Sequence, residues 1–511
     1  MALSKSHRVL CNTVNYFRKE SAIVRFLHKT LQCKKCLTPE TVNPNFRGLE
    51  YAITGPLLQK AIEIEREISQ GHKKKFENVM RLNIGDAQSL GQPPITFLRQ
   101  VLTLVTYPDL MNDKTFPEDA KLRARNILEK CPGGSAGSYS DACGMEIIRR
   151  QIAKYIEKRD NVASHWRNCM MGQGAADMAK KFLTILQLSK DGLETGILNP
   201  VPEYPFYSST IAELGLKRID YFSDEDNQWN VNINELQRAI DEAKSRCNPR
   251  AIIVINPGNP TSHVLTKENM EEIVKFAFRE NLIIIADEVY QNNVIKDDCD
   301  FISFKRILND MGKPYSDMEL VSLMSVSKGV FAESGSKCGY AEVINLDPEI
   351  PPMFVKSLSA SLCPSVLAQT TVYSLVNPPN PNEPSYEQFE HEKNSIIGGL
   401  KMSASIVEES IHSLEGMSCN PIEGAIFFYP RIRLPQGAIE KAERMKLSPD
   451  EFYAMELLQE TGICVVPGSG FKQKPGTYHI RMTLLSDPNM VHKIMERFKK
   501  FHFKFMKGFS P

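Results

Sequence analysis

The chain contains 511 residues, of which 42% are hydrophobic and 24% are charged. These fractions are typical of globular proteins, so a largely disordered chain is excluded, and the length favours two or three domains. The formal net charge is +1, and without a basic stripe we expect no nucleic-acid partner. The longest aliphatic runs span about five residues, whereas a membrane-spanning helix needs about 20, so we expect no membrane insertion.

Residues 1–36 form a basic leader that carries eight lysines and arginines and a single acid, Glu20. Apolar residues recur in this segment at helical intervals, and it lacks the continuous apolar core of a secretory signal. Both features are typical of a mitochondrial presequence. The composition therefore favours the mitochondrial matrix, and the alternative is the N-terminal arm of a cytoplasmic protein.

The twelve cysteines are too few for a disulfide scaffold in a chain of this length. Cys33 and Cys36 have half of a zinc-knuckle spacing, but no second Cys or His pair follows them at a suitable distance. We therefore expect no metal site, and reduced thiols fit an intracellular compartment.

From roughly residue 165 to residue 345, short aliphatic runs alternate with longer amphipathic segments, which is typical of βα units and a largely parallel sheet. The strands expected in this region lie at 195–198, 251–255, 282–286 and 320–324. The expected helices lie at 178–188 and 267–280.

A second region follows the Pro- and Asn-rich stretch 377–384, which is the best candidate for a linker. Beyond it we expect a long helix over 386–409, a basic terminal helix, and strands over 425–428, 462–466 and 478–484. The predicted organisation is a leader (1–36), an N-terminal arm with part of a small domain (37–115), a large cofactor-binding domain (116–376) and the rest of the small domain (377–511).

Polar residues stand at the carboxyl ends of the predicted strands, where open α/β sheets bind ligands. Asp287 follows five aliphatic residues, and an ionised carboxylate is costly there unless it meets a cation. Lys328 follows the next predicted strand, and a lysine partly removed from water can form a Schiff base. The pair suggests pyridoxal phosphate (PLP), with the lysine on the aldehyde and the acid at the pyridine nitrogen. Taken singly, Asp287 could cap a helix and Lys328 could be a solvated loop residue.

Three motifs resemble the fold-type-I aminotransferases: Asn256-Pro-Gly-Asn-Pro-Thr261, Ala286-Asp-Glu-Val-Tyr290 and Ser325-Val-Ser-Lys328-Gly329. The resemblance covers residues 37–511 and narrows to the alanine aminotransferase family through stretches at 83–88, 94–100, 107–110, 462–471 and 477–483. It implies an α/β fold whose large domain has a mostly parallel sheet covered by helices, with a smaller α+β domain. It also implies transfer of the amino group of L-alanine to 2-oxoglutarate in two half-reactions.

The resemblance implies a role for each residue around the cofactor ring. Lys328 would hold the PLP aldehyde and move the substrate proton, and Asp287 would pair with the pyridine nitrogen. Asn259 and Tyr290 would bind the phenolic oxygen, and Tyr204 would stack on the ring face.

The same resemblance implies which residues bind the cofactor phosphate and the substrate α-carboxylate. Tyr139 would reach the phosphate from the neighbouring subunit, which implies a homodimer. Arg481 and the main chain of Gly55 would bind the substrate α-carboxylate, although strand alternation by itself could place Arg481 on a solvated face. The remaining phosphate ligands would be Gly174, Ala175, Ala176, Ser325, Ser327 and Lys337.

The chain departs from the family pattern at four positions. Lys337 and Thr54 stand where the family has an arginine, Ala176 where it has a hydroxyl residue, and Ser262 where it has a glycine. Lysine cannot make the two-pronged contact of an arginine. A lost charged hydrogen bond costs about 1.5–3 kcal/mol, so we expect PLP to bind roughly one to two orders of magnitude more weakly.

The Schiff-base lysine, the pyridine acid and the carboxylate arginine are all retained, so the favoured function is a PLP-dependent transaminase acting on amino acids and 2-oxo acids. The alternative is a divergent paralogue with other PLP chemistry or little activity, retained as a folded dimeric partner.

Overall fold

The computed structural model describes residues 35–47, 49 and 55–509. The chain divides into two compact units, Met1–Leu49 and Glu50–Pro511. In the first unit the described part contains a short helix, α2 (Pro44–Arg47). Most of the predicted leader (1–36) lies outside the described residues. The elements that follow belong to the second unit.

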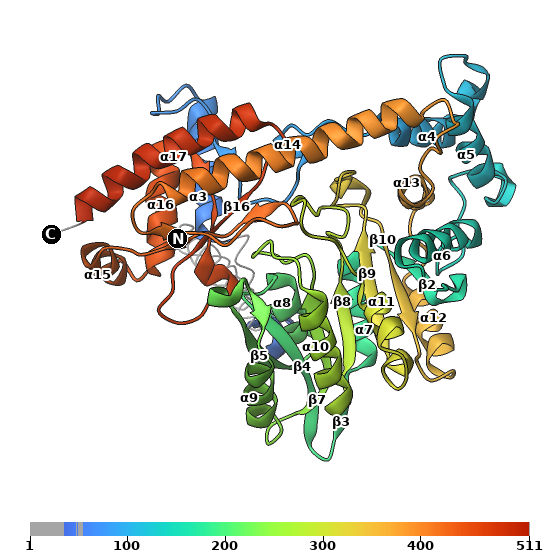
Figure 1. Cartoon of the computed structure of the whole chain (residues 1–511), viewed down its shortest axis with the longest axis horizontal. Helices are drawn as coiled ribbons and strands as arrows, with labels where there is room; N and C mark the ends of the chain where they lie inside the picture. Colours follow the sequence, from blue (N-terminus) through green and yellow to red (C-terminus); the bar gives the residue numbers. More distant parts are fainter. Residues whose placement is uncertain (1–34, 48, 50–54, 510–511) are drawn as a thin grey trace, which may run out of the picture. The chain divides into compact units, whose positions relative to one another are not determined.

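A nine-stranded sheet forms the centre of the second unit (Figure 1). Its strands lie in the order β2-β10-β9-β8-β7-β4-β5-β6, with β3 paired to β4. The strands from β9 to β5 in this order run parallel, whereas β10 is antiparallel to both neighbours. The bounds are β2 (Cys169–Gly172), β3 (Ser189–Lys190), β4 (Leu193–Val201), β5 (Lys217–Asp224), β6 (Asn230–Val231), β7 (Asn248–Ile255), β8 (Ile283–Asp287), β9 (Leu320–Ser325) and β10 (Gly339–Ile344).

Helices cover both faces of this sheet, as alternate residues of β7 show. Ile253 and Ile255 pack with α7, α8 and α12, while Ile252 and Val254 pack with α9, α10 and α11. Because both faces are buried, the central strands are continuous aliphatic runs. The helices are α7 (Ala175–Ile185), α8 (Pro205–Glu213), α9 (Ile233–Ala243), α10 (Lys267–Arg279), α11 (Phe304–Met311) and α12 (Ile350–Ala360).

A third core is formed by the helices that precede the central sheet and by those at the C-terminus. The long α14 (Tyr386–His412) packs along α17 (Pro488–Phe509), as the orange and red helices of Figure 1 show. The other helices of this core are α3 (Pro56–Ser69), α4 (Thr96–Thr106), α5 (Glu118–Leu128), α6 (Glu146–Asp160), α13 (Val366–Val376), α15 (Gln436–Arg444) and α16 (Pro449–Thr461).

Short strands complete this region in three small sheets. The sheet that matters for the site has the order β12-β16-β15, formed by β12 (Phe427–Phe428), β16 (Ile480–Thr483) and β15 (Val466–Pro467). The two other sheets pair β1 (Met80–Arg81) with β14 (Ile463–Cys464) and β11 (Met417–Ser418) with β13 (Arg431–Ile432).

The elements predicted from the aliphatic runs are present, with shifted ends. The helix expected from residue 178 begins at Ala175, directly after Gly174. The strand expected over 462–466 is divided, because β14 pairs with β1 whereas β15 pairs with β16. The domain boundaries expected after residues 36, 115 and 376 stay predictions. In the described ranges, no helix has the length and apolar character needed to cross a membrane.

The strand register brings the chemically important positions to one edge of the sheet. Ile255 lies opposite Asp287, Asp287 opposite Leu323, and Ser325 opposite Gly339. Since β7, β8 and β9 run parallel, their carboxyl ends meet at this edge. Open α/β sheets bind ligands in the crevice outside such ends.

Two neighbouring glycines in α14 test the packing of this helix. A Cβ on Gly399 would lie 2.0 Å from the backbone oxygen of Ser486, whereas a Cβ on Gly398 meets nothing within 4 Å. Gly398→Ala should raise the free energy of unfolding by about 0.5–1 kcal/mol through helix propensity. Gly399→Ala should lower it by roughly 1–3 kcal/mol, because the backbone must move. Denaturant unfolding measures both, and equal effects would contradict the close approach at Gly399.

Candidate active site

A cavity of about 500 Å³ lies at the carboxyl ends of β7, β8 and β9. Polar groups of the central sheet line it together with Phe427 and Arg481 from the β12-β16-β15 sheet. Most of the predicted site residues are among its lining: Lys328, Asp287, Tyr290, Asn259, Tyr204, Gly174, Ala175, Ala176, Ser325, Ser327, Lys337 and Arg481.

Two predicted site residues do not line this cavity in the single chain. Tyr139 lies on the surface with 75% of its area exposed. Gly55 is the residue that precedes α3. Their predicted roles therefore stay predictions, and that of Tyr139 depends on a second subunit.

Asp287 ends β8 and is 6% exposed. The Tyr207 hydroxyl donates a hydrogen bond of 2.7 Å to its Oδ2 atom. Burial raises the pKa of Asp287 to about 6, although the bond from Tyr207 acts in the opposite direction. The carboxylate is thus ionised at neutral pH at a cost that a cationic ligand group would relieve. The helix-cap alternative is wrong, because the next helix begins only at Phe304.

Lys328 follows β9, and its amine donates a hydrogen bond to the carbonyl oxygen of Gly85. Burial, with a smaller contribution from the charge of Arg481, lowers the pKa of this lysine to about 8. A substantial share of the amine is therefore neutral and nucleophilic near pH 8. A Cβ on Gly85 would lie 3.1 Å from this nitrogen and 2.7 Å from the Phe427 ring, so the approach depends on glycine. The solvated-loop alternative for Lys328 is wrong.

The opposite end of the cavity is suited to an anion. Gly174, with a φ of +95°, directs the chain into the first turn of α7. The backbone amides and dipole of a helix N-terminus favour negative charge. Ser325 lies beside this turn, because its Oγ would be 3.9 Å from a Cβ on Gly174, and the same Oγ donates to the Cys338 carbonyl over 3.2 Å. The exposed Lys337 also lines the cavity. Ala176, in the first turn, offers no hydroxyl.

Aromatic side chains form part of the cavity lining. Tyr204 lies edge-on to Tyr207, with ring centroids 6.2 Å apart. Tyr290 is 1% exposed and lies edge-on to Phe427 at 5.9 Å. Burial raises the pKa of Tyr290, so its phenol is a hydrogen-bonding group rather than a phenolate at neutral pH.

Arg481 on β16 is 2% exposed, so the solvated-face alternative is wrong. Its Nη1 atom donates to Asn259 Oδ1 at 3.2 Å, and Nη2 donates to the Asn83 carbonyl at 2.8 Å. The guanidinium carbon lies 4.1 Å from the ring centroid of Phe427 and 4.9 Å from that of Phe471. Two aromatic faces and two hydrogen bonds thus hold a cation whose planar geometry suits a carboxylate.

Sequence reasoning missed several residues that line this cavity, among them Tyr207, Gly85 and Phe427. Tyr207 had a usable signal, since it follows Tyr204 by three residues in the first turn of a helix, where residues at this spacing are neighbours. Gly85 lies in the stretch 83–88 that carries the resemblance, but its contact with Lys328, like that of Phe427 with Arg481, arises only through the fold.

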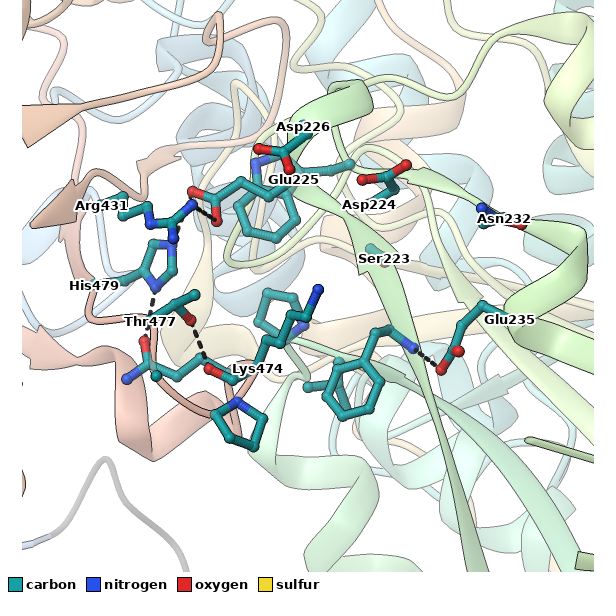
Figure 2. A pocket seen from close by; sticks show the side chains of 17 residues that line it. Ser223, Asp224, Glu225, Asp226, Asn232, Glu235, Arg431, Lys474, Thr477 and His479 are labelled. Carbon is teal, nitrogen blue, oxygen red and sulfur yellow. Dashed lines mark hydrogen bonds and ion pairs between the residues drawn. The ribbon is translucent and has the colours of Figure 1, made fainter. Parts of the chain in front are cut away.

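A second cavity, of about 510 Å³, lies at the carboxyl ends of β4 and β5 (Figure 2). It shares no lining residue with the first. Glu225, in the turn after β5, lies 2.9 Å from His479 Nε2 and 3.4 Å from Arg431 Nη1. His479 Nδ1 lies 2.8 Å from Gln473 Oε1. Because His479 directly precedes β16, this cluster ties the strand of Arg481 to the central sheet.

The buried carboxylate of Asp287 predicts a pH-dependent stability. Its pKa in the folded protein lies above the unfolded value, so its favourable contribution is complete below about pH 4 and is lost as the pH rises through about 6. Cofactor-free Asp287→Asn should therefore be more stable than the unsubstituted protein at pH 8, by roughly 1–3 kcal/mol, and equally stable near pH 4. Denaturant unfolding at both pH values measures this difference.

The matched control is Glu288→Gln. Glu288 is also buried, and burial raises its pKa to about 7, but it does not line the cavity. Adding PLP should stabilise this variant as it does the unsubstituted protein, and should stabilise Asp287→Asn much less. Equal stabilisation of the two variants would refute a role for Asp287 at the cofactor.

The family described as aminotransferase class I and II matches residues 106–498. Over 494 residues the chain is 45% identical to alanine aminotransferase 2 of Xenopus tropicalis, a match that covers 96% of this chain and 94% of the relative. It is 46% identical over 478 residues to alanine aminotransferase 1 of Homo sapiens, with 93% and 96% covered. A probable mitochondrial alanine aminotransferase of Dictyostelium discoideum is 39% identical over 488 residues, with 93% and 91% covered.

Solved structures share the fold at lower identity. An aminotransferase from Escherichia coli superimposes with a TM-score of 0.70 at 21% identity, covering 91% of this chain and 98% of that one. An alanine aminotransferase from Pyrococcus furiosus gives a TM-score of 0.70 at 20% identity, covering 90% and 99%. The predicted fold class, fold-type-I α/β, is confirmed. The chain belongs to the class I and II aminotransferases and, among them, to the alanine aminotransferase family.

Proposed function

We propose that this transaminase uses PLP to transfer the amino group of L-alanine to 2-oxoglutarate, forming pyruvate and L-glutamate. The observation that carries the proposal is one cavity lined by Lys328, Asp287 and Arg481. Relatives at 39–46% identity that are named alanine aminotransferases support the amino donor. Class I and II aminotransferases are PLP-dependent enzymes, which supports the cofactor.

The described residues fit PLP. The cavity, about 500 Å³, falls within the range of roughly 300–1,000 Å³ that small-molecule sites occupy. It combines a buried acid, a lysine of lowered pKa and a helix N-terminus, which match the ring nitrogen, the aldehyde and the phosphate. Gly339 makes room for that helix start, since a Cβ there would lie 2.8 Å from the amide nitrogen of Ala175.

When bound, PLP supplies the aldehyde that takes up the amino group and a ring that withdraws electrons from the substrate Cα. Asp287 would hold its negative charge at the ring nitrogen, and Asn259 and Tyr290 would bind the phenolic oxygen. Tyr204 would cover one face of the ring. The Nζ atom of Lys328, with its pKa near 8, takes the Cα proton and returns it.

The substrates share an α-carboxylate, and Arg481 binds it from a buried and fixed position. The main chain of Gly55 makes a second contact with the same group. The amides of Gly174, Ala175 and Ala176 would hold the phosphate, together with Ser325, Ser327 and Lys337, which line the same cavity.

The active assembly is a homodimer in which Tyr139 reaches the phosphate of the neighbouring subunit. The exposure of Tyr139 in the single chain, at 75%, supports this arrangement. We place the protein in the mitochondrial matrix, with the cytoplasm as the alternative. The basic leader and the relative from Dictyostelium discoideum that is named mitochondrial support the matrix.

Turnover tests the proposal directly. Protein supplied with PLP should convert L-alanine and 2-oxoglutarate into pyruvate and L-glutamate, and its visible absorption should change with alanine and return with 2-oxoglutarate. Lys328→Ala should lower kcat by roughly 10²–10⁴-fold, because it removes the group that moves the proton. Lys474→Ala, which alters an exposed lysine of the second cavity, should keep normal turnover.

Two other outcomes would overturn part of the proposal. Bound PLP whose spectrum is indifferent to alanine would retain the cofactor and refute the substrate. Absence of PLP binding even at high concentration would favour the divergent paralogue that is retained as a dimeric partner.

The phosphate end provides a separate prediction, because Lys337 and Ala176 supply fewer hydrogen bonds than the family pattern. Lys337→Arg and Ala176→Ser should each tighten PLP binding by about tenfold. Fluorescence titration with PLP measures the Kd, and Lys474→Arg is the control for a lysine-to-arginine change outside the site. Unchanged Kd values in both variants would refute a weakened phosphate site.

A further inference from the structure

The loop that follows β7, residues 256–265, contacts the segment leading into β12 through Ser262. This serine is 1% exposed and has a φ of +59°. Glycine reaches this left-handed region at no steric cost, whereas serine does not. The local backbone therefore does not favour a serine here, and its hydroxyl is the feature that distinguishes it from glycine.

That hydroxyl donates a hydrogen bond of 2.5 Å to the backbone oxygen of Phe427. The backbone oxygen of Ser262 in turn accepts from the amides of Glu423 and Gly424, at 3.1 and 2.9 Å. One buried residue of the central-sheet loop thus holds the segment 423–427 at both ends. Without the hydroxyl, two backbone contacts would remain at the start of the segment and the contact at Phe427 would be lost.

The ring of Phe427 lies against the guanidinium of Arg481, the proposed ligand of the substrate carboxylate; we call this ring the aromatic floor of Arg481. The guanidinium carbon of Arg481 lies 4.1 Å from its ring centroid, and Tyr290 lies 5.9 Å away. On another side the ring limits the space at Gly85, against which the amine of Lys328 is bonded. A shift of the Phe427 backbone would therefore move the ring against which the Arg481 guanidinium packs.

A second contact connects the same loop to Arg481. Asn259, three residues before Ser262, accepts the hydrogen bond from Arg481 Nη1 at 3.2 Å. The loop thus contacts the arginine through Asn259 and also fixes the backbone of the ring beneath it. Ser262 itself does not line the cavity.

We propose that Ser262 is a positioning residue for substrate binding. Its hydroxyl fixes the backbone of Phe427, so that the ring keeps the Arg481 guanidinium in the geometry that accepts the α-carboxylate. The inference rests on the proposed function, in which Arg481 binds that carboxylate. Phe427 lies directly against Arg481 but reaches Lys328 only through Gly85, so the loss of the contact should change KM more than kcat.

Ser262→Gly and Ser262→Ala test the proposal together. Both remove the hydroxyl, but glycine also removes the cost of the positive φ, so Ser262→Gly should have a Tm above that of Ser262→Ala. Both should raise KM for L-alanine and for 2-oxoglutarate by about three- to tenfold, with kcat within about twofold of the unsubstituted enzyme and the Kd of PLP unchanged. The control is Lys446→Gly, at an exposed residue with a φ of +58°, which gives the same backbone relief without altering KM.

If Ser262→Gly has a Tm above that of Ser262→Ala but an unchanged KM, the role of Ser262 is purely structural and the proposal is overturned. An equal fall of kcat and kcat/KM would also overturn it, because the effect would then lie on the chemical step.

A failure of the proposed function would be visible separately, as an unsubstituted protein that does not turn over alanine. In that case the test is the Kd of propionate, which has the carboxylate of alanine without its amine. Saturation-transfer NMR measures this Kd without turnover. Weaker propionate binding in both Ser262 variants than in Lys446→Gly supports the positioning role, and an equal Kd refutes it.

Discussion

A carboxylate held at the buried end of β8 is the constraint on which the rest of the site depends. Asp287 is 6% exposed, and burial raises its pKa to about 6 even though the Tyr207 hydroxyl stabilises its charge. Such a group lowers the stability of the cofactor-free fold at neutral pH, and a cation placed beside it would be bound favourably. The parallel register of β7, β8 and β9 keeps this charge at the sheet edge where the polar ends of all three strands meet.

The two cations of the cavity are linked electrostatically. Arg481 is fixed as a permanent charge by two hydrogen bonds and two aromatic rings, and its field adds to burial in lowering the pKa of Lys328 to about 8. The side chain proposed to bind the substrate carboxylate thus also helps to keep part of the lysine neutral. When a substrate carboxylate neutralises Arg481, its influence on Lys328 weakens, so substrate binding and lysine protonation are coupled.

Arg481 reaches this position because side chains of the central-sheet region hold the small C-terminal sheet from two sides. Ser262 bonds to the backbone of Phe427 in β12, and Glu225 meets His479 just before β16. Both contacts join elements far apart in the sequence, and both act on the strands that carry the arginine or its aromatic floor. The position of Arg481 therefore depends on the contacts between the two sheets as well as on its own hydrogen bonds.

The sequence by itself determined the central sheet, because strands buried on both faces must be aliphatic throughout, and β7, β8 and β9 were predicted on that ground. Its motifs also identified Asp287, Lys328 and about half of the other residues that line their cavity. The two-residue strands β12, β14 and β15 have no periodicity of their own, and their pairing depends on long-range packing. Arg481 bonds to a residue 398 positions away, and Lys328 to one 243 positions away. Local patterns indicate only which face of an element is buried, so the tertiary structure decided that Gly85 contacts the amine of Lys328 and that Phe427 lies against Arg481.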